Sequence, residues 1–388
     1  MELSKSYIES FIQKEIVNNP IYLLKNFETN LINHFNQLFD VKDSEISKKY
    51  MITNIVNSVV TKLNKNQMTI YQRKKKLHKL KQLKLPEQRS PEWYAMRETM
   101  ATASSLASVL GKCHFTTRDE LLLSKIISQP YTPNPITEWG VKYEDVAIQF
   151  YEELNSTKVL DFGLIPHTEF PIFGASPDGI CDDVGNDEFV GRMVEIKCPP
   201  KRKFTKTVPP HYLMQCLGQL EVCDLDECDF FQVKIEEYEN EEEYLKDAFE
   251  IDGIVQHGRT HLNYPKGVTI TYKNLQEEGK FIYRYCELNK SYEDYKQWIS
   301  SQPSENLHEV KWWKITRYEQ TLVLRDRDWW TSILDKIQAF YDDMLFYKNP
   351  ENTNILQNRV NESKKRKRKT EVKPLPEHLL VSSDEEDQ

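Results

Sequence analysis

The residues best suited to chemistry lie together between positions 174 and 197, in the stretch GASPDGICDDVGNDEFVGRMVEIK. A turn presents Asp178, and a short apolar run then presents Glu195 and Lys197. Strand side chains alternate between two faces, so the glutamate and the lysine are expected to project together. Two carboxylates beside an ammonium group suit metal-dependent phosphodiester cleavage, because carboxylate oxygens bind Mg²⁺ and the metal makes a water molecule more acidic.

This stretch predicts a β-hairpin whose first strand begins at Asp178 and whose turn contains residues 185–187, Gly-Asn-Asp. Its second strand is expected to present Met193, Glu195 and Lys197 on one face and Val194 and Ile196 on the other, toward a core. Lys197 would orient the water or offset charge on phosphorus. An ordinary surface hairpin is the simpler alternative for a Glu-x-Lys pair, and Asp178 weighs against it.

Two upstream segments carry further candidates. A short capped helix is expected over 102–110, and its N-terminus with Arg97 offers an anion site beside Ser104. The alternative is a capping serine and a surface arginine. A longer amphipathic helix over 137–154 carries Glu144 away from its apolar stripe, where a lone glutamate is usually solvated.

Taken in order, these segments resemble the PD-(D/E)xK nuclease superfamily. Within it they are similar to the YqaJ-type viral recombinases, the group of phage lambda exonuclease, found in bacteriophages and large DNA viruses. The resemblance covers about residues 88–236, under half of the chain. It is carried by RSPEWYAMRETMATASSLASVLG at 89–111, WGVKYED at 139–145, SPDG at 176–179, VEIKCP at 194–199 and HYLMQCLGQLEV at 211–222.

The resemblance implies an α/β fold with a mixed central sheet of about five strands flanked by helices. It also implies a Mg²⁺-dependent 5′-to-3′ exonuclease on double-stranded DNA, with Mn²⁺ able to substitute. The roles that it implies are metal binding by Glu144, Asp178 and Glu195, action on water by Lys197 and Gln215, and binding of the 5′-terminal phosphate by Arg97 and Ser104. We add Ser176, Lys201, Arg202 and Lys203 as candidates for contact with the DNA backbone, while Gln219 is either a site residue or a structural one.

Partners follow from the same resemblance. The substrate would be a duplex DNA end, digested to mononucleotides with a 3′ single-stranded overhang left for recombination or repair. A single-strand annealing protein and a trimeric ring are further expectations.

Composition limits the classes of protein. The 388 residues are 39% hydrophobic with a formal charge of −8, and they contain no apolar run of about 20 residues that would cross a membrane. The N-terminus, MELSKSYIES, lacks a signal-peptide pattern, so an intracellular protein is expected. Seven cysteines without a C-x-x-C pair argue against disulfide scaffolds, zinc ribbons and iron-sulfur relatives.

The flanking regions are expected to be appendages. Residues 1–85 read as a helical domain that ends in a basic run at 61–85, either a DNA-contacting element or a solvated linker helix. The nuclease domain is placed at 86–350, and residues 351–388 are expected to be disordered. The run KKRKRK at 364–369 suits nuclear import or a DNA tether, which leaves the host nucleus or a cytoplasmic viral replication site open. Two roles are open for the tryptophans Trp312, Trp313, Trp329 and Trp330. They could stack on exposed bases, but tryptophans more often belong to a protein core.

Three rival functions remain. An endonuclease or branch-cutting nuclease shares the chemistry, and a DNA-end-binding scaffold with an inactive site shares the fold. A glycosidase with two carboxylates is disfavoured because it has no use for Lys197 or the basic segments.

Overall fold

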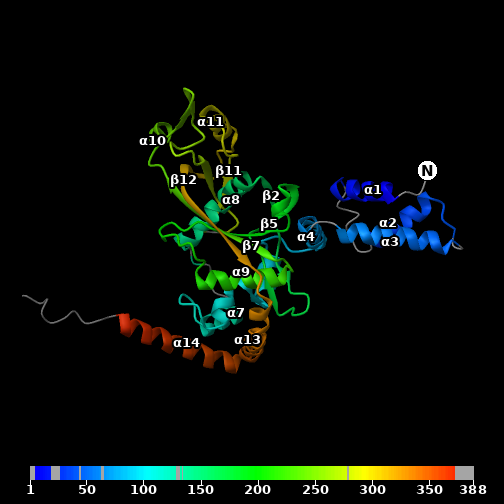
Figure 1. The fold of residues 1–388 in the computed structure, drawn as a ribbon. Helices are drawn as coiled ribbons and strands as arrows, with labels where there is room; N and C mark the ends of the chain where they lie inside the picture. Colours follow the sequence, from blue (N-terminus) through cyan, green and yellow to red (C-terminus); the bar gives the residue numbers. More distant parts are fainter. Residues whose placement is uncertain are drawn as a thin grey trace, which may run out of the picture.

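The computed structural model describes residues 5–18, 27–42, 45–62, 65–127, 132, 134–277 and 279–371. Its centre is a mixed seven-stranded sheet in the order β11-β10-β12-β7-β6-β5-β2, with helices packed around it (Figure 1). The expected α/β architecture is confirmed, but the expectation of about five strands is wrong. The sheet strands are β2 (Thr157–Leu160), β5 (Gly179–Gly185), β6 (Met193–Lys197), β7 (Glu227–Glu237), β10 (Lys266–Lys273), β11 (Phe281–Tyr285) and β12 (Leu307–Leu324).

Smaller strands form two further sheets. One has the order β1-β4-β3 and the other pairs β8 with β9. Their bounds are β1 (Ala101–Thr102), β3 (Ile165–Pro166), β4 (Phe173–Ala175), β8 (Phe249–Ile251) and β9 (Ile254–Gln256). The α-helices of the described residues are α1 (Lys5–Asn18), α2 (Phe27–Leu38), α3 (Ile46–Lys62), α4 (Lys65–Lys81), α5 (Pro91–Glu98), α6 (Leu106–Val109), α7 (Arg118–Ile126), α8 (Pro135–Asn155), α9 (Pro210–Val222), α10 (Glu241–Lys246), α11 (Tyr292–Ser301), α12 (Arg327–Thr331), α13 (Leu334–Tyr347) and α14 (Pro350–Glu371).

The predicted hairpin is confirmed. Strands β5 and β6 are antiparallel, with Gly179 opposite Val194 and Ile180 opposite Met193. Strand β6 then runs parallel to β7, and a parallel pair needs a crossover connection, which α9 supplies. The carboxylate-bearing strand therefore lies inside the sheet, between two partners.

Both faces of β6 are buried. Met193 packs with Leu217 and Leu220 of α9, whereas Val194 and Ile196 pack with apolar residues of α8 on the other face. The alternation of the strand was predicted correctly. The face that carries Glu195 is as buried as the face of Val194 and Ile196, because α9 covers it.

The N-terminal helices have a core of their own. Helices α1, α2 and α3 pack around a cluster that includes Ile8, Leu31, Phe35 and Val56, and they form a separate bundle in Figure 1. Predicted helical residues at 19–26 lie outside the described residues.

Helix α4 contains most of the basic run and docks on the region of the seven-stranded sheet. Ion pairs join Arg73 to Glu227 at 2.6 Å, Lys74 to Asp187 at 2.8 Å, and Lys76 to Asp226 at 2.7 Å. Lys81 pairs with Asp182 and Asp183 of β5. Much of the run is therefore neutralised by protein carboxylates, and this arrangement favours the linker interpretation over a DNA-contacting face.

The region after residue 250 extends the sheet. A single long strand, β12, pairs with both β10 and β7, and its register against β7 shifts between Ile315 and Arg317. Trp312, Trp313 and Trp330 are buried, which confirms the core alternative for them. Two helices, α12 and α13, follow β12 along the chain.

The expectation of disorder beyond Pro350 is wrong for residues 350–371, which form α14. Leu356 and Val360 are buried in the main core, and Arg359 forms a bidentate pair with Asp119 of α7 at 2.7 and 2.8 Å. Lys364 to Arg366 are exposed on this helix, whereas residues 372–388 lie outside the described residues. No helix in the described part of the chain is long and apolar enough to cross a membrane.

Two glycines provide a matched test of packing. A Cβ at Gly163 would collide with the carbonyl oxygen of Pro86, whereas a Cβ at Gly140 in α8 would meet nothing within 4 Å. We expect Gly163→Ala to destabilise the protein by about 1–3 kcal/mol. Gly140→Ala should stabilise it by about 0.5–1 kcal/mol, because alanine loses less entropy in a helix. Denaturant unfolding measures both, and a neutral Gly163→Ala would contradict the close approach.

Candidate active site

Glu195 is the centre of the site and is fully buried. Its Oε1 accepts hydrogen bonds from Lys197 Nζ and from Gln215 Nε2, the latter at 2.7 Å. Its Oε2 accepts from Gln219 Nε2, also at 2.7 Å. The two glutamines lie one turn apart on α9, so the crossover helix brings both amides onto one carboxylate. Burial, and then repulsion from Asp178, raises the pKa of Glu195 to about 7.

Lys197 lies at the end of β6 and joins two carboxylates. Its Nζ bonds to Glu195 and lies 3.8 Å from Asp178 Oδ2. Burial alone would lower the pKa of Lys197, but attraction to Glu195 and Asp178 outweighs it and raises that pKa. The side chain therefore remains an ammonium group, with the ring of Tyr212 at 5.3 Å from Nζ.

Asp178 precedes β5 and is fixed by the neighbouring strand. Its Oδ2 accepts a hydrogen bond from the backbone N–H of Ile196 at 2.7 Å. That contact joins the turn to β6 midway between Glu195 and Lys197. The hairpin pairing therefore sets the spacing of all three side chains.

Glu144 approaches from α8 on another side. Its carboxylate is paired with Arg89, whose Nη2 lies 3.2 Å from Oε1 and 3.4 Å from Oε2. Burial, and then repulsion from Asp178, raises the pKa of Glu144 to about 8, while Arg89 and Lys197 oppose the shift. Glu144, Lys197, Arg202 and Tyr212 line a cleft of about 360 Å³.

The donor set has the chemistry that a divalent cation requires. Glu144, Asp178 and Glu195 offer hard carboxylate oxygens, and burial, followed by repulsion from Asp178, raises the pKa values of the two glutamates. Among the described residues, no group of three or more His, Cys, Asp or Glu side chains is close enough together to hold a metal ion. Arg89 on Glu144 and Lys197 between Glu195 and Asp178 occupy the intervening space. The residues therefore fit a metal by donor type, and binding requires the carboxylates to draw together.

A second polar cluster surrounds Arg97. Its Nη2 donates to Ser104 Oγ at 3.1 Å, and its guanidinium lies 4.3 Å from the ring of Trp93. Trp93 Nε1 in turn donates to Ser176 Oγ at 2.8 Å, two residues before Asp178. The predicted pair of Arg97 and Ser104 is thus in contact, and Trp93 connects it to the turn that carries the carboxylate.

Lys125 of α7 adds a second cation to this cluster. Its Nζ donates to the backbone oxygen of Arg97, and the carboxylate of Glu98 attracts this ammonium group. Burial, and then repulsion from Arg97, lowers the pKa of Lys125 to about 8. Burial also lowers the pKa of Arg97. Two neighbouring cations that repel each other form a favourable site for an anion.

The basic loop after β6 is only partly aimed at the cleft. Arg202 donates to Gln232 Oε1 at 2.8 Å and lies over Tyr212 at 5.1 Å, so it belongs to the cleft wall. Lys201 and Lys203 are exposed. Of these three candidates, Arg202 alone lines the cleft beside Lys197.

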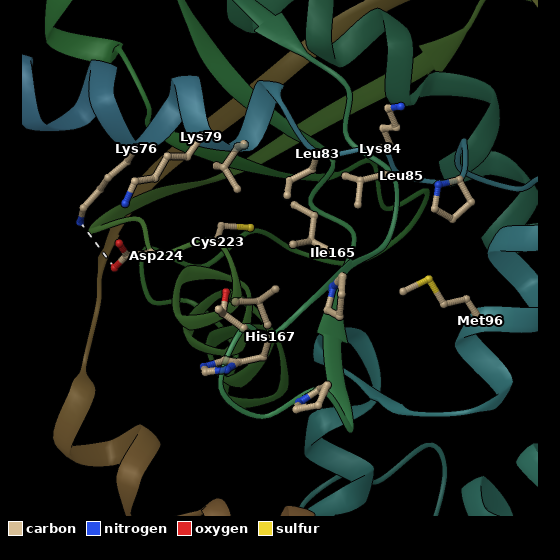
Figure 2. Close-up of a pocket in the computed structure, with 16 residues that line it drawn as sticks. Lys76, Lys79, Leu83, Lys84, Leu85, Met96, Ile165, His167, Cys223 and Asp224 are labelled. Atoms are coloured by element: carbon tan, nitrogen blue, oxygen red, sulfur yellow. Dashed lines mark ion pairs between the residues drawn. The ribbon is translucent and has the colours of Figure 1, made fainter. Parts of the chain in front are cut away.

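Another groove, of about 560 Å³, lies beneath α4 (Figure 2). Its apolar floor includes Leu83, Leu85 and Ile165, and the side chains of Lys79 and Lys84 lie at its edge. None of the site carboxylates named above lines it. The groove and the cleft beside Glu144 and Lys197 are therefore separate features.

Sequence reasoning did not assign roles to Arg89 and Lys125. Arg89 stands directly before Ser90, which caps α5, and it is the first residue of the segment 89–111 that carries the family resemblance. This position was the signal that could have identified it. Lys125 had no such signal, because its proximity to Arg97 depends on how α7 packs.

Comparison with known proteins locates a domain in this chain. Residues 92–226 match the model of the YqaJ-like viral recombinase domain. An uncharacterized protein of Acanthamoeba polyphaga mimivirus is 30% identical over 308 residues, which covers 71% of this chain and 56% of that protein. A protein of African swine fever virus is 28% identical over 153 residues, which covers 34% of this chain and 44% of that protein. The chain thus spans about half the length of these relatives.

Solved structures give weaker likenesses. An alkaline exonuclease from Laribacter hongkongensis is similar at 19% identity and a TM-score of 0.39, over 70% of this chain and 99% of that one. A phage-related exonuclease from Haemophilus somnus is similar at 12% identity and a TM-score of 0.34, over 66% of this chain and 96% of that one. The match to the YqaJ-like viral recombinase domain thus spans residues 92–226, and this range contains Glu144 on α8 and the hairpin region that carries Asp178, Glu195 and Lys197.

Proposed function

We propose that the protein is a Mg²⁺-dependent exonuclease that digests one strand of duplex DNA from its 5′ end. The YqaJ-like domain supports a DNA nuclease, and the observation that carries the proposal is the contact of Lys197 with buried Glu195 beside Asp178. Release of mononucleotides would leave a 3′ overhang for recombination or repair.

Glu144, Asp178 and Glu195 would hold the metal, and Mn²⁺ would substitute for Mg²⁺. When bound there, the metal supplies Lewis acidity toward a phosphoryl oxygen and makes a water molecule more acidic. The ammonium group of Lys197 would orient the attacking water and offset charge that develops on phosphorus. Gln215 and Gln219 would keep Glu195 oriented through their hydrogen bonds.

The raised pKa values predict that metal binding strengthens as pH increases. A carboxylate must lose its proton to bind metal, so protons compete with Mg²⁺ below a pH of about 7 to 8, the pKa values of Glu195 and Glu144. Below these pKa values, we expect each increase of one pH unit to lower the half-saturating Mg²⁺ concentration by roughly tenfold for each proton that the metal displaces. Calorimetric titration at about pH 6 and about pH 9 measures the change. Equal affinities would contradict the assignment of these two ligands.

Preference for an end would come from Arg97, Ser104 and Lys125. A terminal phosphate carries a charge of about −1.5 to −2, whereas an internal phosphodiester carries about −1, so two cations favour the terminus. We expect the wild type to degrade 5′-phosphorylated duplex about tenfold faster than 5′-hydroxyl duplex, as charge-assisted hydrogen bonds allow. Arg97→Ala and Lys125→Ala should each reduce this preference.

The exposed Lys246 pairs with Glu242 and provides a matched control. Lys246→Ala should keep the 5′-phosphate preference of the wild type. A wild type that degrades both ends equally would show that Arg97, Ser104 and Lys125 do not read the terminal phosphate.

Circular DNA separates the proposed exonuclease from its rivals. Linear duplex should be degraded, whereas covalently closed circular duplex should remain intact, because it offers no end. Cutting of the circle would establish an endonuclease instead. Binding to linear ends without turnover in Mg²⁺ or Mn²⁺ would support the inactive scaffold.

Assembly and location belong to the same proposal. We infer a homotrimer around duplex DNA, a single-strand annealing protein as partner, and action in the host nucleus or at a cytoplasmic viral replication site. Ser176, Lys201, Arg202 and Lys203 would contact the DNA backbone. Mass measurement in solution with and without duplex DNA tests the trimer.

A further inference from the structure

Arg89 covers the carboxylate of Glu144. A single nitrogen, Nη2, lies 3.2 Å from Oε1 and 3.4 Å from Oε2, so it contacts both carboxylate oxygens. The arginine side chain is 48% exposed and the glutamate side chain 29% exposed, so the pair lies at the rim of the site, where a cation from solvent reaches it. A cation that binds these two oxygens of Glu144 meets this guanidinium.

The neighbours of Arg89 hold it in this place. Gln88 Nε2 donates to Asp161 Oδ1 at 3.1 Å, to Phe162 O at 2.9 Å and to Pro177 O at 3.0 Å. Arg89 itself has a φ of +67°, a left-handed conformation that residues other than glycine rarely adopt. The side chain of Ser90 then caps α5 by accepting from the backbone N–H of Trp93 at 3.2 Å.

This anchoring connects Arg89 to the catalytic turn. Pro177, one of the three acceptors of Gln88, directly precedes Asp178. The strained backbone at Arg89 persists because the residues on both sides of it are bound. The guanidinium is therefore placed on Glu144 by the same contacts that support the turn of Asp178.

The balance of charge around Glu144 determines which cation a metal ion would displace. Glu144, Asp178 and Glu195 are faced by two cations, Lys197 and Arg89. Lys197 is held by two carboxylates inside the site, whereas Arg89 is held by one at the rim. A divalent ion that approached Glu144 would repel both cations, and Arg89 is the one that can move into solvent.

We propose that Arg89 and a divalent metal ion compete for the carboxylate of Glu144, so that Arg89 is a positioning residue that the metal displaces. This inference rests on the proposed function. The guanidinium of Arg89 stays paired with the Glu144 carboxylate until the metal binds. Its release then leaves a planar guanidinium near Glu144. A purely structural arginine would have the opposite effect, because its loss would disorder Glu144 and weaken metal binding.

The test is a titration with Mn²⁺ in the absence of DNA, in which free Mn²⁺ is measured by electron paramagnetic resonance. Arg89→Ala should bind Mn²⁺ about two- to fivefold more tightly than the wild type, as expected from the loss of one competing ion pair. Arg89→Lys should lie between them, because it keeps the charge and loses the planar group. Arg359→Ala removes an arginine that pairs with Asp119 on α7, and it should bind Mn²⁺ like the wild type.

A double-mutant cycle isolates the interaction. If the competition acts through Glu144, Arg89→Ala should not change Mn²⁺ affinity in a Glu144→Gln background. Unchanged or weaker affinity in Arg89→Ala, with its melting temperature preserved, would overturn the inference and leave the proposed function intact. A wild type that binds no Mn²⁺ would overturn both.

Discussion

Lys197→Ala is expected to reduce Mg²⁺-dependent degradation of linear duplex DNA by about 10³-fold or more, since a positioned charge and a proton-handling group are lost together. The lysine contacts Glu195 and lies 3.8 Å from Asp178, and no other lysine in the described residues pairs with either. Its loss also leaves two neighbouring carboxylates without their cation. Rates of mononucleotide release measure the effect.

Folding must be controlled in this experiment, because removal of one partner from a buried ion pair destabilises a protein by about 3–5 kcal/mol. Circular dichroism and thermal melting of Lys197→Ala, with and without Mg²⁺, separate unfolding from loss of chemistry. Lys246→Ala on α10, an exposed lysine, should retain wild-type activity. A folded Lys197→Ala protein that degraded duplex at the wild-type rate would exclude Lys197 from the reaction.

Asp178→Asn is expected to reduce activity by about 10²- to 10³-fold, because the substitution removes one charged metal ligand and keeps the shape of the side chain. The amide oxygen can still accept the hydrogen bond from Ile196 N, so the hairpin should remain folded. The affinity for Mn²⁺ should fall at the same time, and that change distinguishes a ligand from a merely structural aspartate. Both quantities are measured on the same preparation.

Asp182→Asn is the matched control for this substitution. Asp182 lies four residues further along on β5, and its carboxylate pairs with Lys81 of α4. Its neutralisation should weaken the docking of α4 slightly and leave metal affinity unchanged. If Asp178→Asn and Asp182→Asn gave the same Mn²⁺ affinity and the same rate, Asp178 would have no special place in the site.

Local patterns predicted the part of the fold that surrounds the site. The hairpin of β5 and β6 follows from turn residues and alternation, and α9 places Gln215 and Gln219 one turn apart by helical spacing. The sequence left Gln219 as either a site residue or a structural one, and in the structure its Nε2 donates to Glu195 Oε2 at 2.7 Å and to the backbone oxygen of Ser176 at 3.5 Å. Only the packing of α9 on β6 shows which carboxylate it meets.

Long-range packing explains what the sequence did not predict. Strands β10 and β12 pair across the intervening residues 274–306, and no local signal specifies that register. Helix α14 has a polar composition typical of disorder, yet Leu356, Val360 and Arg359 fix it to the core and to α7. The pairs Arg89–Glu144 and Arg97–Lys125 likewise join segments whose proximity depends on the completed fold.

Metal-dependent cleavage from a 5′ end is the central property proposed for this protein. The most direct measurement follows a linear duplex labelled separately at its 5′ and 3′ termini, with wild type in Mg²⁺, with wild type in EDTA, and with Lys197→Ala in Mg²⁺. We predict early release of the 5′ label as a mononucleotide, slow loss of the 3′ label, and no release in EDTA or with Lys197→Ala. Release of label in EDTA, or equal release by Lys197→Ala, would contradict the central claim.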